Sequence, residues 1–187
     1  EVRVVRMEGW ERWMDYEATG LPWMPPSPAM LTLATARVYP GTCLLEGTNV
    51  SEGRGTQTPF EVVGAPFIRG DLAAERLQEA GLPGVRWQVA GFVPTRCKWA
   101  GERCDGIRLV VEDWEAFRPV TAGAYLLRVL RDLAGAAFEW RAEHFDNLIG
   151  NGWVREQIEH GCPPQDIVDG WQTGLDEFGE RRRGYLL

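Results

Sequence analysis

The sequence predicts a mixed α and β fold in which several helices pack on a small sheet. Segments 85–93 and 106–112 alternate apolar and polar residues in the manner of strands. After residue 70, several other segments place apolar residues at helical spacing. With 187 residues, 44% of them hydrophobic, the chain can fill a sizeable core. We therefore expect an α+β protein of one domain or two small ones.

Charge and hydropathy exclude two classes of partner. The formal net charge is -7, whereas proteins that bind nucleic acid or anionic membranes present a basic face. No apolar run approaches the length that crosses a bilayer, so we expect no membrane span. The chain begins at Glu1 without a charged-then-apolar leader. We interpret this N-terminus as a cut end, with any targeting signal upstream.

The first third of the chain predicts short elements separated by proline. We expect a strand over 2–5, an amphipathic helix over 7–16 and a rigid extended segment over 20–28, where four prolines exclude helix. A helix over 32–38, with Thr32 as N-cap, should end at Pro40-Gly41. Strands should follow over 41–45 and 59–68.

The remainder predicts a helix over 71–80 and then the two strands, paired antiparallel through a loop rich in Arg, Lys, Gly and Cys. Leucines and valines form a broad apolar stripe over 122–133, which indicates a well-buried helix. Further helices are expected over 144–149, 154–160 and 164–178. No internal repeat and no low-complexity segment is present.

The most distinctive stretch is 46–56, Glu-Gly-Thr-Asn-Val-Ser-Glu-Gly-Arg-Gly-Thr. It combines two carboxylates, a guanidinium, three hydroxyls, an amide and three glycines, which is typical of a shaped loop that lets a ligand approach exposed N–H groups. The alternative is a long solvated connection. We treat this loop as the candidate functional loop.

Two carboxylates of the loop are candidates for acid–base chemistry. Glu46 and Glu52 lie six positions apart, which would separate them by about 20 Å in an extended chain. A bend at Gly47 can bring them to the separation of about 5 to 10 Å at which paired carboxylates hydrolyse glycosides. Arg54, between two glycines, offers a planar fork for a carboxylate or phosphate. Its alternative role is an ion pair with Glu52 or Glu61.

Other polar groups leave alternatives open. Thr48 and Asn49 can bind sugar hydroxyls or satisfy the loop's own backbone. Lys98 can place a charge in a cleft or remain a solvated loop lysine. A divalent cation could use Glu46, Asn49 and Glu52, but the spacing is not that of an EF-hand, and we assign no metal and no cofactor.

The histidines and cysteines form no recognisable catalytic or metal motif. Neither His144 nor His160 lies near a serine or cysteine in a nucleophile motif, and no phosphate-binding glycine motif is present. The four cysteines lack zinc-site spacing. Cys97 and Cys104 can pair across the predicted hairpin or remain free thiols.

Several stretches together resemble one enzyme family, the bacterial exo-β-N-acetylmuramidases, formerly a family of unknown function. The resemblance rests on segments 19–28 (TGLPWMPPSP), 38–49 (VYPGTCLLEGTN), 51–56 (SEGRGT) and 59–66 (PFEVVGAP). Trp171, Phe178, Arg182 and the closing Tyr-Leu-Leu at 185–187 also fit the family's C-terminal end. The resemblance spans essentially the whole chain.

The resemblance implies a glycoside hydrolase that releases N-acetylmuramic acid from the non-reducing end of peptidoglycan fragments. It also implies a two-domain architecture, Rossmann-like and then α/β, of which this chain is the later part. Residues 1–70 would end the catalytic domain and 71–187 would form the C-terminal α/β domain. An upstream Rossmann-like domain or a second chain would be a partner, and a periplasmic or extracellular location is favoured. Neither nucleic acid nor a membrane span is implied.

The chain also departs from the family pattern. The family's Pro-Glu-His-Gly segment, which carries a candidate catalytic glutamate, has no counterpart here, because Glu143-His144 lies in a different context. Ala29 and Leu31 replace an expected Asn and Pro. We therefore expect the activity to be incomplete in this chain, and a non-catalytic peptidoglycan- or sugar-binding domain is the alternative.

Within the resemblance, the functional loop supplies the candidate site. We expect Glu46 and Glu52 as the catalytic carboxylates, one of them contacting the reacting sugar or its attacking water. Arg54 should bind the lactyl carboxylate that distinguishes N-acetylmuramic acid from its partner sugar. The remaining candidate substrate-binding residues are Tyr39, Thr48, Asn49, Ser51 and Thr56.

Overall fold

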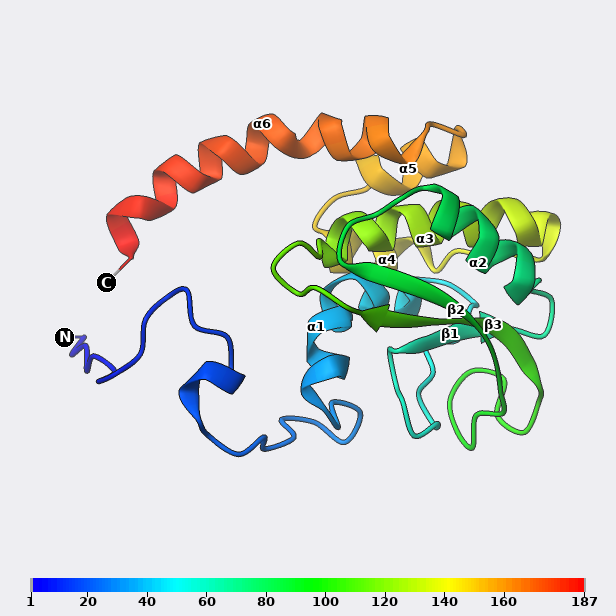
Figure 1. Ribbon diagram of the computed structural model, residues 1–187. Coiled ribbons are helices and arrows are strands. Elements are labelled where there is room, and N and C mark those ends of the chain that lie inside the picture. The colour runs from blue at the N-terminus through cyan, green and yellow to red at the C-terminus, as the bar shows by residue number, and fades with distance from the viewer. Residues whose placement is uncertain (1, 187) are drawn as a thin grey trace.

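A computed structural model describes residues 2–186 of the chain; Glu1 and Leu187, which the predicted domain ranges and C-terminal motif include, lie outside the described residues. Its centre is a three-stranded antiparallel sheet in the order β1-β3-β2, formed by Val62–Ala65 (β1), Val85–Phe92 (β2) and Cys104–Val111 (β3) (Figure 1). β2 and β3 pair along their whole lengths, from Val85 opposite Val111 to Phe92 opposite Cys104. The predicted mixed α and β class and the antiparallel pair are confirmed.

Helices cover one face of this sheet, where α2 (Gly70–Glu79) and α3 (Pro119–Ala134) lie side by side (Figure 1). α1 (Leu33–Thr42) crosses α3. The inner faces of these elements are apolar because their sequences alternate or repeat at the period of each element. The fully buried residues of the core include Leu77, Ile107, Leu126, Leu127 and Leu130.

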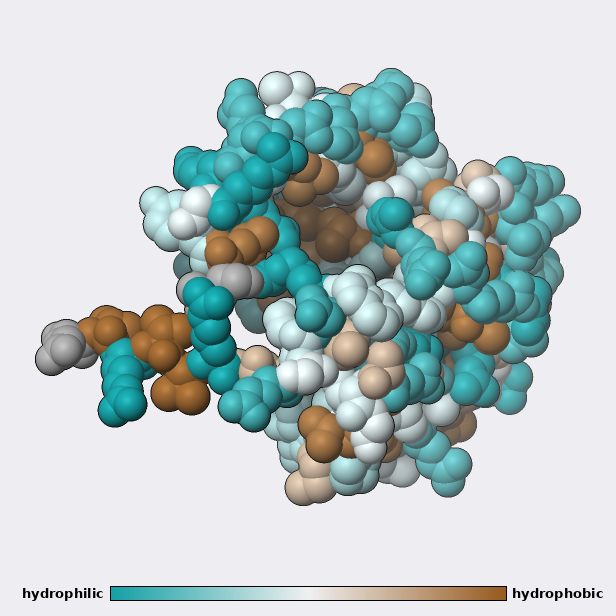
Figure 2. Space-filling view, turned by 60° about the vertical axis from the view of Figure 1, so that its left-hand side comes forward, coloured by the Kyte–Doolittle hydropathy of each residue, from teal (hydrophilic) through white to brown (hydrophobic). Residues whose placement is uncertain are grey.

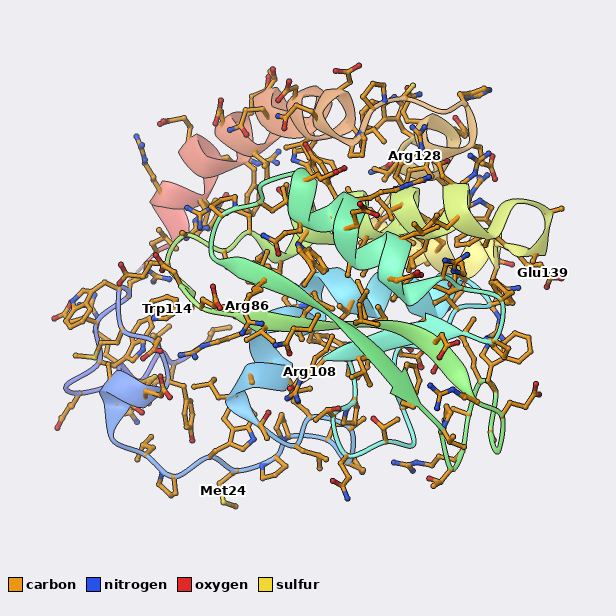
Figure 3. All side chains as sticks on the ribbon, turned by 45° about the vertical axis from the view of Figure 1, so that its right-hand side comes forward. Met24, Arg86, Arg108, Trp114, Arg128 and Glu139 are labelled. Carbon is orange, nitrogen blue, oxygen red and sulfur yellow. The ribbon has the colours of Figure 1, made fainter. Side chains whose placement is uncertain are left out.

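The outer helices are α4 (Ala142–Ile149), α5 (Trp153–Glu159) and α6 (Pro164–Arg182), and all three were expected close to these positions. α6 packs its first half on α3, and its second half extends beyond the body of the molecule (Figure 1). Arg128 of α3 lies beneath this layer (Figure 3) and donates to the carbonyl of Cys162, just before α6. Of the described helices, none combines the length and apolar composition needed to cross a bilayer.

The predictions for the N-terminal segment were wrong. Residues 2–5 form no strand and 7–16 no helix; the regular structure there is one short 3₁₀ turn, η1 (Glu17–Thr19). The physical reason is a lack of packing, because Val2 is 91% exposed and Trp13 is 71% exposed, and short helices and strands depend on burial of one face. Apolar side chains of this segment project from one side of the molecule (Figure 2).

The predicted strand over 41–45 was also wrong. α1 continues through Pro40 to Thr42, and a 3₁₀ turn, η2 (Cys43–Gly47), follows it. Pro40 is tolerated because it lies on the exposed side of the helix, where water can bond the freed carbonyl. Gly41 packs so closely on α3 that a Cβ would stand 1.9 Å from the Pro119 carbonyl oxygen. The predicted N-cap is confirmed, since the Thr32 hydroxyl accepts from the N–H of Thr35 at 3.1 Å.

Two shorter helical turns complete the described part, η3 (Gly135–Ala137) and η4 (Arg183–Tyr185). The strand expected over 59–68 is present as the shorter β1. Buried residues from 29 to 167 belong to one hydrophobic cluster. The division into domains at residue 70 stays a prediction.

Candidate functional site

Three segments that are distant in sequence meet at one polar pocket. Its volume is about 360 Å³, and its lining comes from the functional loop, the connection between β2 and β3, and the start of α4. The lining residues are Glu46, Glu52, Arg54, Cys97, Lys98, Arg141 and His144. The structure therefore brings both predicted catalytic carboxylates and the predicted arginine together.

The functional loop is packed against the sheet, so the solvated-connection interpretation was wrong. Ser51 and Gly64 exchange backbone hydrogen bonds of 2.8 and 3.0 Å, which attach the loop to β1. Gly53 and Gly55 have φ values of +76° and +88°, a left-handed region that favours glycine. A Cβ would stand 2.4 Å from the Val62 carbonyl oxygen at Gly53, and 2.7 Å from backbone atoms of Arg96 at Gly55. These two glycines fix the shape of the loop.

Glu52 is a buried carboxylate, and Lys98 is its principal partner. The Glu52 side chain is 4% exposed, and Lys98 Nζ lies 3.0 Å from its Oε2. Lys98 also donates to the carbonyls of Leu45 at 2.7 Å and Val50 at 2.9 Å, so all three ammonium protons are used. Burial lowers the pKa of Lys98, and the charge of Glu52 offsets part of that effect. The interpretation of Lys98 as a solvated lysine was wrong.

The backbone around Lys98 is strained. Cys97 and Trp99, on either side of the lysine, adopt φ values of +68° and +58°, which non-glycine residues adopt infrequently. Such conformations persist only where surrounding contacts impose them, and they gather at functional sites. The indole Nε1 of Trp99 donates to the carbonyl of Asn49 at 2.7 Å, which is one such contact. The connection is thereby held against the functional loop.

Arg54 bridges the two carboxylates. Its Nη2 lies 2.9 Å from Oε1 of Glu46, and its Nε lies 3.3 Å from Oε1 of Glu52. The contact with Glu52 is an ion pair but not a hydrogen bond, so this buried N–H has no acceptor among the described residues. Burial lowers the pKa of Arg54, but the hydrogen bond and charge of Glu46 more than offset this, and the pKa is raised overall. The guanidinium also lies over the Phe60 ring at 5.1 Å.

The two carboxylates differ in their exposure to the pocket. Because one guanidinium touches both, Glu46 and Glu52 lie within the roughly 10 Å that paired carboxylates of glycosidases span. The Glu46 side chain is 22% exposed and uses one oxygen on Arg54, whereas Glu52 is 4% exposed with both oxygens near cations. Glu46 is therefore the carboxylate that a ligand in the pocket can reach.

The other predicted binding residues lie outside the pocket lining. The hydroxyls of Thr48, Ser51 and Thr56 bond backbone groups of the loop itself. Asn49 joins the loop to the segment before α4, donating to the Ala137 carbonyl at 2.8 Å and accepting from the Glu139 N–H at 3.0 Å.

Tyr39 packs edge-on against Phe60, with ring centroids 4.8 Å apart. Burial raises the pKa of its phenol, and the charges of Cys43 and Glu46 add to the effect. Tyr39 therefore supports the wall of the site from behind.

Three residues of the pocket were not expected at a site, Cys97, Arg141 and His144. Arg141 and His144 lie about ninety positions beyond the functional loop, and no local motif marks them. They reach the pocket because the N–H of Arg141 donates to the Gly47 carbonyl at 2.8 Å, which sets the start of α4 against η2.

The cysteines of the β2–β3 hairpin remain free thiols; Cys97 is exposed and Cys104 is buried. The predicted alternative of a disulfide is therefore absent from this structure. Burial raises the pKa of Cys104 to about 11, so its thiol stays protonated at neutral pH. Among residues 2–186, no cluster of three His, Cys, Asp or Glu side chains could hold a metal ion.

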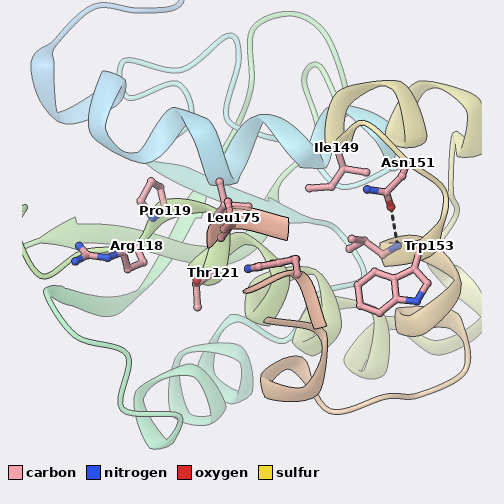
Figure 4. A pocket seen from close by; sticks show the side chains of 10 residues that line it. Arg118, Pro119, Thr121, Ile149, Asn151, Trp153 and Leu175 are labelled. Carbon is pink, nitrogen blue, oxygen red and sulfur yellow. Dashed lines mark hydrogen bonds between the residues drawn. The ribbon is translucent and has the colours of Figure 1, made fainter. Parts of the chain in front are cut away.

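A second pocket, of about 390 Å³, lies between α3, α5 and α6 (Figure 4). Trp153, Trp171 and Leu175 contribute apolar surface to it, and Asn151 accepts from the N–H of Val154 at 3.3 Å. It has no carboxylate in its lining. Acid–base chemistry on a sugar needs such groups, so the polar pocket is the candidate site.

Comparison with known proteins identifies the family. Residues 37–187 match the family model described as "Exo-beta-N-acetylmuramidase NamZ, C-terminal", and residues 1–34 match the one described as "Exo-beta-N-acetylmuramidase NamZ, N-terminal". The peptidoglycan beta-N-acetylmuramidase NamZ of Bacillus subtilis (strain 168) is 42% identical over 188 residues, which cover 100% of this chain and 45% of that protein.

Two solved structures of DUF1343 family proteins from Bacteroides fragilis share the fold at 27% identity. One aligns with a TM-score of 0.90 over 99% of this chain and 50% of that one, and the other with 0.63 over 87% and 43%. The chain thus spans about half the length of the relatives it matches. The chain belongs to the exo-β-N-acetylmuramidase NamZ family.

Proposed function

We propose that this chain forms part of an exo-acting glycoside hydrolase that releases N-acetylmuramic acid from the non-reducing end of peptidoglycan fragments. The observation that carries the proposal is the pair Glu46 and Glu52, joined by Arg54 at the wall of a polar pocket. The relative from Bacillus subtilis is named for activity on the same polymer.

In this proposal Glu46 contacts the reacting sugar or its attacking water. Hydrolysis breaks the bond between the anomeric carbon and the leaving oxygen, which takes up a proton, while water adds to the anomeric carbon. Glu46 is the accessible carboxylate and can accept the proton of that water. Glu52, held by Lys98 and Arg54, supports this role by fixing the position of the Arg54 guanidinium that contacts Glu46.

The second acid–base group would come from outside this chain. Glu52 has both oxygens committed to cations, so it is poorly placed to donate a proton to the leaving oxygen. The chain covers 45% of its Bacillus subtilis relative, and an upstream Rossmann-like domain or a second chain can supply the missing acid. Tyr39, Thr48, Asn49, Ser51 and Thr56 shape the wall that receives the sugar.

The test measures turnover of a chromogenic N-acetylmuramic acid glycoside, and calorimetric binding of muramic-acid-containing fragments, on the 187-residue chain and on the chain joined to its upstream part. In the joined protein we expect Glu46→Gln to lower kcat by about 100-fold or more, the size typical of lost acid–base catalysis. Glu143→Gln is the matched control, because Glu143 lies beside the site on α4 but does not line it.

Unimpaired turnover in both Glu46→Gln and Glu52→Gln would refute the catalytic roles. Saturable binding without turnover, in the joined protein as well as in the 187-residue chain, would instead favour the alternative of a non-catalytic sugar-binding domain.

A further inference from the structure

The charges that line the polar pocket do not balance. Two carboxylates, Glu46 and Glu52, face three cationic side chains, Arg54, Lys98 and Arg141. Among these five side chains there is one more cation than there are carboxylates. A pocket whose lining has one excess cation favours a ligand with one negative charge.

The excess charge belongs to Arg141, because the other two cations are already paired. Arg54 contacts both carboxylates, and Lys98 directs its three protons to Glu52 and two carbonyls. Arg141 forms no ion pair with any carboxylate of residues 2–186, and its side chain donates no hydrogen bond within that range. Its five N–H donors are available to a ligand.

The position of Arg141 is nevertheless well defined. Its backbone N–H is bonded to the Gly47 carbonyl at 2.8 Å. In the next turn of α4, Phe145 is fully buried against Gly47, where a Cβ on the glycine would stand 2.5 Å from the phenylalanine Cβ. The guanidinium also lies near enough to Lys98 for its charge to lower the pKa of that lysine. An anion bound by Arg141 would thus contact a side chain whose backbone is held in place by these contacts.

We propose that Arg141 is the residue that binds the lactyl carboxylate of N-acetylmuramic acid, an assignment that rests on the proposed function. Arg54 already contacts Glu46 through Nη2 and Glu52 through Nε, so a ligand carboxylate would share its charge with two carboxylates of the protein and meet their negative charge as well. Arg141 binds the same group without breaking any pair, and its planar fork matches a carboxylate in two parallel hydrogen bonds.

The experiment compares N-acetylmuramic acid with its lactyl methyl ester, in which a methyl group replaces the negative charge of the carboxylate. Calorimetric titration measures the dissociation constant of each on the 187-residue chain and on three variants, Arg141→Met, Arg141→Lys and Arg54→Met. Circular dichroism melting of each variant checks that it is folded.

The wild-type chain should bind the acid about 10- to 100-fold more tightly than the ester, the strength of one charge-assisted bidentate contact. Arg141→Met should abolish this preference while leaving the affinity for the ester unchanged, and Arg141→Lys should retain part of it. The preference should rise at low salt, because the contact lies at the solvent-exposed edge of the pocket.

Three results would overturn the assignment of Arg141, and they distinguish its failure from a failure of the proposed function. A preference that survives in Arg141→Met but is lost in a folded Arg54→Met would make Arg54 the lactyl-binding residue. If the wild-type chain bound the acid and the ester equally, it would bind the sugar without recognising the lactyl charge, and the role of Arg141 would be wrong. Binding of neither ligand by the wild-type chain would count against the saccharide site itself, and the assignment would fall with it.

Discussion

Replacing Lys98 by methionine tests whether the buried ion pair organises the functional loop. Methionine keeps much of the length and volume of the lysine but removes its charge and three hydrogen bonds of 2.7, 2.9 and 3.0 Å. Glu52, 4% exposed, would keep only the contact with Arg54 Nε at 3.3 Å. The carbonyls of Leu45 and Val50 would lose their lysine donor.

The expected cost follows from this burial. Removing one partner of a buried pair costs about 3–5 kcal/mol, and the remaining Arg54 contact places this case near the lower end. In a protein of this size each kcal/mol lowers the melting temperature by about 2–4 °C, so Lys98→Met should melt about 10 °C below wild type. Urea unfolding followed by tryptophan fluorescence measures the free energy directly.

Two comparisons isolate the ion pair. Arg86→Met removes an exposed pair with Glu112 on the outer side of the sheet (Figure 3), whose partners are 43% and 55% exposed, and it should cost less than about 1 kcal/mol. The double variant Glu52→Gln/Lys98→Met should lose about 1–3 kcal/mol less than the sum of its single changes. A Lys98→Met cost no larger than that of Arg86→Met, with additive single changes, would refute the reasoning.

Three further predictions concern residues that hold the site and α4 in place. Gly47→Ala should destabilise the fold by at least about 1–3 kcal/mol, because its Cβ would stand 2.5 Å from Phe145 of α4. Gly174→Ala is the control: it has open space around it and should stabilise the fold by about 0.5–1 kcal/mol in the same urea assay. Unchanged stability of Gly47→Ala would contradict the close packing. Arg155 lowers the pKa of Asp146 from 3.8 through its hydrogen bonds. The wild-type protein should therefore be more stable than Asp146→Asn above about pH 4, and this difference in stability should disappear as the pH falls toward about 2. A difference in melting temperature between the two proteins that stays the same from about pH 5 to about pH 2 would exclude this linkage. Asn49→Ala should lose about 1–3 kcal/mol, since it removes both hydrogen bonds to the segment before α4, and unchanged stability with weakened sugar binding would instead make Asn49 a ligand contact.

The sequence by itself determined the elements whose local pattern and packing agree. The leucine stripe of α3 corresponds to a buried face. The period of two corresponds to burial in β3 and at Val85 and Trp87 of β2, whereas Val89 is 64% exposed. The sequence pattern gave wrong predictions where the segment is not packed or where distant segments determine its packing. Trp10 and Trp13 have helical spacing but remain exposed without a helix, and the Leu44–Leu45 pair is buried by a 3₁₀ turn that follows α1.

The same distinction holds for the site. Glu46, Glu52 and Arg54 were recognisable from the sequence because they share one glycine-rich loop with a distinctive composition. Only the tertiary structure decided that Lys98 neutralises Glu52 and that Arg141 reaches the same pocket from the start of α4. Neither residue carries a local signal of this role, since burial and charge balance depend on which distant segments fold together. The sequence therefore determined the chemistry of the functional loop, and tertiary packing decided which of its charges remain free to meet a ligand.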